Sequence, residues 1–348
     1  MARAAREATS AVHIGFDVGG TKIFGVATDG AGKLLHTVRE PTPAGAQHLV
    51  TTLAGMVRQL APQPGPVSVG VGMAGLITTD GRVTISPNLT GVDGATVGTD
   101  LSAALDMPIS FDNEVNCAAR WELADGAAQG IDHGVMVAVG TGIGGAFMLR
   151  GEVLRGSLGL AGEPGHMIVE AGGRACPCGR RGCWEMYASG SALDRLAGER
   201  LGGEVRGPDV TAAARHGDVG ALEVLGEYSY WLALGISNLC VLTDPEMVVI
   251  GGGLSEDWDL IAQPVDEHLT QLLIGRTAES RPAVVRSKAG ELSAALGAAL
   301  GGAREHSAAL GGARQHSAAL GGAREHRAAL GGVHTEGAVP DGGSEPVT

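Results

Sequence analysis

Two segments of the chain share an arrangement in which a short β-rich run enters a glycine turn and leaves it as a second β-rich run. The first covers residues 12–28 with its turn at Val18–Thr21, and the second covers residues 135–149 with its turn at Gly140–Gly142. β-Branched and apolar runs bounded by glycine are typical of strands joined by tight turns. Because each half of the chain opens in this way, the sequence predicts two related α/β lobes around a cleft.

Helical and strand patterns follow each hairpin. Leu49, Leu53, Met56 and Leu60 recur on one face of a predicted helix, because they are spaced by three and four residues. The other predicted strands are Lys33–Arg39, Val67–Met73, Ile109–Phe111 and Val248–Ile250, and the other predicted helices are Thr99–Leu105, 115–128 and 221–242. A length of 348 residues suits two domains. We expect a first lobe over 12–120 and a second over 121–300.

The C-terminal residues 301–348 differ from the rest. A ten-residue unit, Gly-Gly-Ala-Arg-Glu-His-Ser-Ala-Ala-Leu, occurs three times from Gly301 with few changes. Each Gly-Gly pair costs a helix about 2 kcal/mol relative to alanine. We therefore expect a low-complexity, mostly disordered tail. Its histidines at 306, 316, 326 and 334 could hold a metal only loosely, because none has a second ligand at a fixed spacing.

Charge and cysteine content restrict the partners and the compartment. A net charge of −13 argues against nucleic acid or an anionic membrane as a partner, because both would repel the chain. No apolar run approaches the roughly 18 residues of a membrane span. Three of the five cysteines crowd into Cys176–Cys183, while Cys117 and Cys240 stand alone in apolar surroundings. This pattern predicts a cytoplasmic protein with reduced thiols.

Glycine turns of this kind can bind phosphate, since glycine lets backbone N–H groups approach one point. Each turn alone could equally be an ordinary hairpin, but one at the start of each half favours a shared role. A third glycine run follows a buried strand and would admit an adenine or a ribose. The candidate phosphate and nucleotide residues are Asp17, Gly19, Gly20, Thr21, Lys22, Gly140, Thr141, Gly142, Gly144, Gly251, Gly252 and Gly253. Asp17 would orient Mg²⁺ through water.

Another glycine run, Gly70–Gly75, formally matches the dinucleotide fingerprint. That fingerprint requires a helix to begin directly after the glycines. The chain instead continues through Leu76 to a turn at Asp80-Gly81, without a helical period. The context therefore argues against a nicotinamide-dependent enzyme.

Four residues within an eighteen-residue stretch are good zinc ligands: His166, Cys176, Cys178 and Cys183. Thiolates and an imidazole in a tetrahedral set suit Zn²⁺, and four protein ligands leave no open position. The predicted metal is therefore structural and would hold a loop in place. The alternative is a group of unrelated reduced cysteines.

Glu163-x-Gly165-His166, the Cys-x-Cys-Gly-x-x-Gly-Cys run that ends in Trp184-Glu185, and the two glycine turns resemble the ROK family (repressors, open reading frames and kinases). The resemblance is strongest to its bacterial glucokinases and extends from about Val12 to about Leu300. The cysteine run joined to Glu-x-Gly-His is highly specific, whereas the glycine turns are shared with the wider hexokinase and actin-like superfamily. The resemblance implies a two-lobed ribonuclease-H-like (actin/hexokinase-type) ATPase fold that closes over a sugar.

The resemblance also implies which residues bind the sugar. The matching positions are Asn88, Asn113, Glu163, His166 and Glu185. Amides and carboxylates suit sugar hydroxyls, which both donate and accept hydrogen bonds. His166 would bind zinc through one ring nitrogen and a sugar hydroxyl through the other, so that the metal would fix its tautomer.

One position departs from the family pattern. The family's kinases carry Asn-Asp, and that Asp is the general base, but this chain carries Asn113-Glu114. The carboxylate remains, on a side chain that is one methylene longer, and a misplacement of about 1 Å can cost roughly 10²-fold in rate. Asp112, two residues earlier, is a fallback base.

The leading hypothesis is phosphoryl transfer from Mg·ATP to a hexose, most readily the 6-hydroxyl of glucose, with Glu114 as the base. The alternative is a sugar-binding or regulatory protein with weak or no catalysis, because of the change at residue 114. A repressor is disfavoured, because Asp17 leaves no room before it for a helix-turn-helix. The choice of hexose and of ATP against polyphosphate stays open, since 90–97 lacks the tryptophan usual in glucokinases. The resemblance implies a homodimer or homotetramer.

Overall fold

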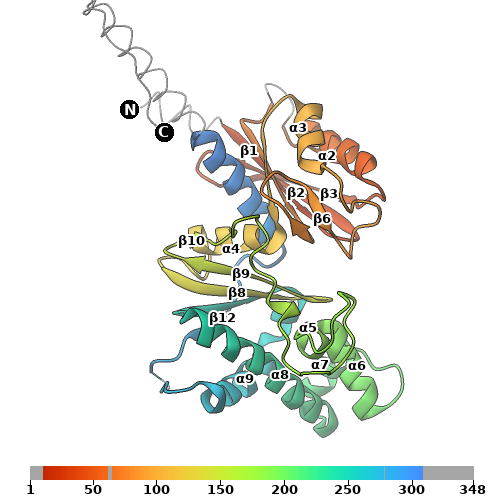
Figure 1. Ribbon diagram of the computed structural model, residues 1–348, viewed down its shortest axis with the longest axis vertical. Coiled ribbons are helices and arrows are strands. Elements are labelled where there is room, and N and C mark those ends of the chain that lie inside the picture. Colours follow the sequence, from red (N-terminus) through yellow and green to blue (C-terminus); the bar gives the residue numbers. More distant parts are fainter. Residues whose placement is uncertain (1–10, 62–64, 278, 309–348) are drawn as a thin grey trace, which may run out of the picture. The chain divides into compact units, whose positions relative to one another are not determined.

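The computed structural model describes residues 11–61, 65–277 and 279–308. It contains two five-stranded sheets, with the strand orders β3-β2-β1-β4-β7 and β10-β9-β8-β11-β12 (Figure 1). The strands of the first sheet are β1 (Val12–Val18), β2 (Lys22–Asp29), β3 (Leu34–Pro41), β4 (Ser68–Met73) and β7 (Ile109–Asn113). Those of the second sheet are β8 (His133–Val139), β9 (Ile143–Leu149), β10 (Glu152–Val153), β11 (Met247–Gly251) and β12 (Ala283–Arg286). A separate ribbon pairs β5 (Leu76–Ile77) with β6 (Val83–Ile85).

The two large sheets repeat one pattern of strand directions. In the first sheet β1 pairs antiparallel with β2, β2 antiparallel with β3, and the β1–β4 and β4–β7 pairs are parallel. In the second sheet β8–β9 and β9–β10 are antiparallel, and β8–β11 and β11–β12 are parallel. The repeated pattern confirms the predicted pair of related α/β units, each of which opens on a hairpin with a glycine turn.

Helices connect the strands. They are α2 (Ala46–Leu60), α3 (Val97–Leu105), α4 (Glu114–Asp125), α5 (Glu185–Ala188), α6 (Gly190–Leu201), α7 (Gly207–Arg215), α8 (Val219–Thr243) and α9 (Trp258–Leu272). Three short 3₁₀ turns are η1 (Pro164–His166), η2 (Gly253–Asp257) and η3 (Gly290–Leu292), and residues 293–308 are helical. Among the described residues, no helix is both long and apolar enough to cross a membrane.

One face of the first sheet is a hydrophobic layer against α2 and α3. Alternate residues of β1, namely Ile14, Phe16 and Val18, are completely buried there together with Leu49 and Leu53 of α2. Full burial of such a side chain contributes about 1.5–3 kcal/mol. The leucine spacing that predicted this helix therefore marks the face that packs on the sheet.

The second sheet is covered on both faces. Alternate residues of β8 (Val135, Val137 and Val139) pack with residues of α6 to α9, and α8 and α9 lie side by side over that face (Figure 1). Met136, which points to the other face of β8, packs with Val115 of α4 and its neighbours. Helix α4 thus belongs to the packing of both sheets, since it also lies against β4 at Gly72.

The opposite face of the first sheet is lined by glycine and receives the last described helix. A methyl group on Gly15 would lie 1.9 Å from the Ala295 carbonyl oxygen, and one on Gly70 would lie 2.0 Å from that of Ala298. Gly302 in turn leaves room for the backbone of Val69. Only glycine permits helix and sheet backbones to approach this closely.

This packing bears on two expectations. Residues 301–308 are helical rather than disordered, because the close approach of Gly302 to the sheet offsets the low helix propensity of glycine. Residues 295–299, which the sequence placed with the second lobe, pack instead on Phe24 and Val26 of the first sheet. The remainder of the predicted tail, 309–348, lies outside the described residues, and the division into lobes stays a prediction.

We expect Gly15→Ala to lower the free energy of unfolding by about 1–3 kcal/mol, because the added methyl must push the backbone of helix 293–308 off the sheet. Gly55→Ala is the matched control, since a methyl there meets nothing within 4 Å and should stabilise α2 by up to about 1 kcal/mol. Urea unfolding of the three proteins measures both effects. Equal midpoints for the two variants would contradict the packing described above.

Candidate active site

The register of the first sheet places two aspartates in one row. Asp17 of β1 pairs with Gly72 of β4, and Gly72 pairs with Asp112 of β7. Residues in register across parallel strands point to the same face. Asp17 and Asp112 therefore lie on the glycine-lined face, on either side of Gly72.

Glu114 is brought to this row by the start of α4. A methyl group on Gly72 would lie 3.3 Å from the Glu114 Cα, so the residue sits directly over the glycine. Asn113 caps the helix, because its Oδ1 accepts from the N–H groups of Val115 at 2.7 Å and Asn116 at 3.3 Å. Its Nδ2 donates to the Gly75 carbonyl at 3.1 Å. The predicted sugar ligand Asn113 thus also fixes the backbone from which Glu114 projects.

Three carboxyl groups of the site have raised pKa values. Burial raises the pKa of Glu114 well above its usual value, and the charges of Asp17, Glu163 and Asp112 raise it further. Burial raises the pKa of Glu163 to about 7, with a contribution from Glu185. Burial likewise raises the pKa of Asp17 to about 6, although Lys22 opposes the shift. Perturbed carboxylates gathered in this way are typical of functional sites.

The Oε2 atom of Glu114 is buried, and none of the described residues forms a hydrogen bond with it. Asp112 is in the opposite situation. Its Oδ1 accepts from Asn116 Nδ2 at 2.9 Å, and its Oδ2 lies 2.6 Å from Arg120 Nη2 and 3.2 Å from Arg155 Nε. Because both oxygens of Asp112 are engaged, the fallback assignment of Asp112 as the base is not supported.

The first glycine turn lies against the loop that contains Asn88. Gly19 N–H donates to the Lys22 carbonyl at 3.1 Å, which closes the turn. A methyl group on Gly20 would lie 2.6 Å from the Asn88 carbonyl oxygen. The structure thus brings the predicted phosphate turn and one predicted sugar residue together. Lys22 points elsewhere, because its Nζ forms an ion pair with Glu291 at 2.9 Å.

The second hairpin, formed by β8, the glycine turn and β9, contacts three parts of the candidate site. A methyl group on Gly144 would lie 2.8 Å from Val115 Cγ2, next to Glu114. One on Gly142 would lie 2.7 Å from Glu185 Oε2, and one on Gly252 would lie 2.4 Å from the Val139 carbonyl. The Gly251–Gly253 run therefore lies beside the strand that enters the Gly140 turn. Thr141, at the tip of the turn, is exposed.

Glu163 and His166 are held against β9 by close backbone contacts. Gly165 leaves no room for a methyl group, which would lie 2.1 Å from the Ile143 carbonyl. Glu163 precedes the 3₁₀ turn η1, and its carbonyl accepts from His166 N–H at 3.2 Å. This turn sets the side chain of Glu163 toward the buried carboxyl groups and that of His166 toward the cysteines.

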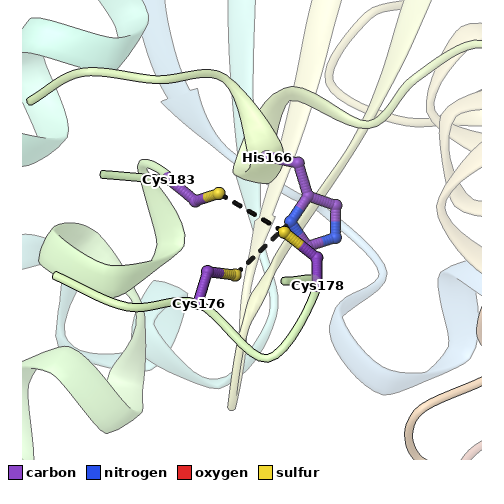
Figure 2. A group of neighbouring side chains, drawn as sticks. All are labelled: His166, Cys176, Cys178 and Cys183. Carbon is purple, nitrogen blue, oxygen red and sulfur yellow. Dashed lines mark hydrogen bonds between the residues drawn. The ribbon is translucent and has the colours of Figure 1, made fainter. Parts of the chain in front are cut away.

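The four predicted zinc ligands converge (Figure 2). Their ligand atoms all lie within 4.8 Å of one another, with Cys178 Sγ 3.6 Å from Cys183 Sγ and Cys176 Sγ 3.8 Å from His166 Nδ1. Tetrahedral zinc, with bonds of about 2.0–2.3 Å, places its ligand atoms roughly 3.5–3.8 Å apart. The donor set therefore fits a structural Zn²⁺.

Glu185 joins this cluster to the second glycine turn. Its Oε1 accepts from Cys176 Sγ at 3.0 Å and lies 3.5 Å from His166 Nδ1, while its Oε2 lies over Gly142. The preceding residue, Trp184, is completely buried, and its Nε1 donates to the Trp231 carbonyl at 2.8 Å. The buried side chain of Trp184 thus fixes the backbone from which Glu185 projects.

Arg155 is a contact residue that sequence analysis missed. It lies in an irregular loop without a distinctive motif, and its contacts with Asp112 and the Phe111 carbonyl reveal it. The sequence held one signal for such a residue: Asp112 directly follows an apolar strand, and a carboxylate in that position usually needs a cationic partner.

Two sheets with one strand pattern, each with a glycine turn in its first hairpin, define a two-lobed ATPase fold of the actin and hexokinase type. A model of the ROK family matches residues 13–301. The chain belongs to the ROK family.

Kinases are found among its relatives. A glucokinase from Streptomyces coelicolor is 31% identical over 304 residues, which cover 82% of this chain and 96% of that protein. An N-acetyl-D-glucosamine kinase from Vibrio parahaemolyticus is also 31% identical, over 83% of this chain and 98% of that protein. The crystal structure of a ROK family glucokinase from Streptomyces griseus in complex with glucose and AMPPNP is similar at a TM-score of 0.74 and 30% identity. That match covers 84% of this chain and 100% of the other.

The convergent thiolates and imidazole predict that the purified protein contains about one zinc ion per chain. Cys178→Ser should remove most of this zinc, because only three ligands would remain. Cys240→Ser is the control, since that thiol is buried among hydrophobic residues of the second lobe. Elemental analysis by mass spectrometry measures the metal. A Cys178→Ser protein with full zinc content would refute the site.

The buried Glu114 predicts a pH-dependent gain of stability in Glu114→Gln. Because its pKa is raised above the ordinary 4.5 in the folded chain, ionisation of Glu114 destabilises the fold as the pH rises above that value. We expect Glu114→Gln to melt at a higher temperature than the unmodified chain at about pH 8 and at a similar temperature at about pH 4.5. The exposed Glu223→Gln should change neither. A gain that is constant with pH would contradict the assignment.

Proposed function

We propose that the chain is an ATP-dependent hexose kinase that phosphorylates the 6-hydroxyl of glucose. The observation that carries the proposal is the buried Oε2 of Glu114, which has no hydrogen-bond partner among the described residues. Its carboxyl group is close enough to Asp17 for the charge of Asp17 to raise its pKa, and the next residue, Val115, contacts Gly144 of β9. A general base needs a pKa near the working pH and an oxygen that is free to accept a proton. Burial raises the pKa of Glu114 above its ordinary value, toward the range of a base, and its Oε2 is the oxygen without a hydrogen-bond partner among the described residues.

In the proposed reaction the hydroxyl oxygen of the hexose forms a bond to the γ-phosphorus while its proton passes to Glu114. The bond between that phosphorus and the departing ADP oxygen breaks. Catalysis of this kind depends on positioning and on neutralisation of charge. Mg²⁺ bound with ATP would supply that neutralisation, and Asp17 would be the carboxylate that orients it. In the two turns, Gly19–Lys22 and Gly140–Gly144, the backbone N–H groups that the hydrogen bonds of Gly19 and Gly140 leave available would hold the phosphates, and Gly251–Gly253 would admit the adenosine.

The hexose is held by Asn88, Asn113, Glu163, His166 and Glu185. Glu163 and Glu185 lie close enough for the charge of Glu185 to raise the pKa of Glu163. In the zinc-bound protein, His166 would use Nδ1, which faces Cys176, for the metal, so that Nε2 is available to a sugar hydroxyl. Zinc would fix the orientation of the ring. We place this zinc enzyme in the cytoplasm, where the cysteines stay reduced.

The proposal is tested by a panel of glucose, mannose, N-acetylglucosamine and N-acetylmannosamine with ATP or polyphosphate and Mg²⁺. We expect ATP-dependent formation of glucose 6-phosphate, and a loss of about 10²–10⁴-fold in kcat for Glu114→Gln, since removal of a general base has that effect. The exposed Glu223→Gln serves as the control and should retain full activity.

Two outcomes would change the proposal. A preference for an N-acetylhexosamine would change the proposed substrate from glucose to that sugar, and the assignment as a sugar kinase would stand. Tight hexose binding without turnover, with turnover restored by Glu114→Asp, would favour the sugar-binding alternative, since the longer side chain would then misplace the carboxylate.

A further inference from the structure

A loop of the second lobe crosses to the first sheet, near the strand that precedes the candidate base. Residues 154–162 leave the second sheet after β10, and Leu158 accepts a backbone hydrogen bond from Thr79 N–H at 3.2 Å, beside β5. The loop returns at Gly162, where a methyl group would lie 2.6 Å from the Gly145 carbonyl. Glu163 follows directly. The loop thus connects the structure around β7 to the segment that contains the predicted sugar residues.

Arg155, in this loop, contacts two consecutive residues of β7. Its Nη2 donates to the Phe111 carbonyl at 2.7 Å, and its Nε lies 3.2 Å from Asp112 Oδ2. Because β7 is the edge strand of its sheet, carbonyls on its open side have no strand partner, and the guanidinium supplies one. The contact with Asp112 is an ion pair, because Nε makes no hydrogen bond with the described residues. A planar guanidinium can hold a hydrogen-bonded carbonyl and a paired carboxylate at a fixed spacing, which lysine cannot do.

The strand end held by Arg155 is two residues from the base. Phe111 and Asp112 lie near the C-terminal end of strand β7, and Glu114 begins α4 immediately after the cap at Asn113. The other donors to Asp112 are the N–H of the adjacent Asn113 and, from α4 itself, Asn116 and Arg120. Arg155 is therefore the contact that fixes this junction with respect to the loop before Glu163.

Charge supports the same conclusion. Glu114 faces Asp17 from β1, Asp112 from β7 and Glu163 from the loop before η1, and Asp17 faces Lys22 and Glu291 in turn. All three groups that face Glu114 are carboxyls, and Asp112 is the one with two guanidinium partners. Removal of Arg155 would leave the charge of Asp112 less compensated, which would make Glu114 harder to ionise.

We propose that Arg155 is a positioning residue for the base: by binding Asp112 and the Phe111 carbonyl together, it fixes the β7–α4 junction that carries Glu114. The inference rests on the proposed role of Glu114. It assigns to the loop 154–162 a function in catalysis although no atom of Arg155 needs to touch the sugar or the nucleotide.

The first test is steady-state kinetics of Arg155→Gln and Arg155→Lys, with the exposed Arg58→Gln as the control. For Arg155→Gln we expect kcat to fall about 10²-fold, as for a displacement of about 1 Å, with KM for ATP nearly unchanged. The acidic limb of the pH profile of kcat/KM should move to higher pH. Arg155→Lys should restore the position of the limb, because it keeps the charge, but restore kcat only in part.

A purely structural role gives a different pattern. Activity would then fall only in proportion to the unfolded fraction, and the acidic limb would stay in place. Wild-type kcat and an unshifted limb in Arg155→Gln would overturn the proposal. If Arg155→Gln does not fold, a wild-type kcat and an unshifted limb in Arg155→Lys would overturn it as well, since that variant has lost the two-acceptor geometry.

A second test needs no turnover. Melting temperatures at about pH 8 are compared for the unmodified chain, Glu114→Gln, Arg155→Gln and the double variant. We expect Glu114→Gln to raise the melting temperature more in the Arg155→Gln background, where the charge of Asp112 is less compensated. Equal increments would overturn the proposal. Unequal increments in a chain without kinase activity would leave the coupling in place and refute the proposed function instead.

Discussion

Contact between helix backbones and the glycines of β1 and β4 determines where the carboxyl groups of the candidate site can lie. Gly15 and Gly70 admit helix 293–308, and Gly72 admits the first turn of α4. Side chains at these positions would hold the helices several ångströms farther from the sheet. Because Asp17 is two residues from Gly15 on the same face, and Glu114 lies on Gly72, the close packing places both carboxyls in a buried environment. Their raised pKa values are a consequence.

Much of this arrangement could be predicted from the sequence because it depends on local patterns. The hairpins of the two halves, the leucine spacing in α2 and the long helix now seen as α8 (Val219–Thr243) appear within a residue or two of their predicted ends. The zinc ligands could be found because their spacing is short and the donor types are specific. Both kinds of signal lie within one element or one loop.

The features that could not be predicted depend on contacts between distant segments. Residues 301–308 contain a Gly-Gly pair that is unfavourable for an isolated helix, and only the glycine face of the sheet explains why they are helical. Lys22 was expected at the phosphates, but Glu291, which is far along the chain, binds it. Asp112 was predicted as a fallback base, but its carboxylate forms ion pairs with Arg120 and Arg155. In each case local propensity or spacing is overruled by a tertiary partner.

The zinc cluster and the second glycine turn are coupled through one side chain. Glu185 contacts Cys176 and His166 through Oε1 and lies over Gly142 through Oε2. Its backbone is fixed by Trp184, which fills the space left by Gly235 on α8. A carboxylate with one oxygen at the cluster and the other at the turn cannot move toward either without leaving the other. A metal bound by the cysteines would therefore restrain the predicted phosphate turn as well as His166, although no phosphate needs to touch the metal.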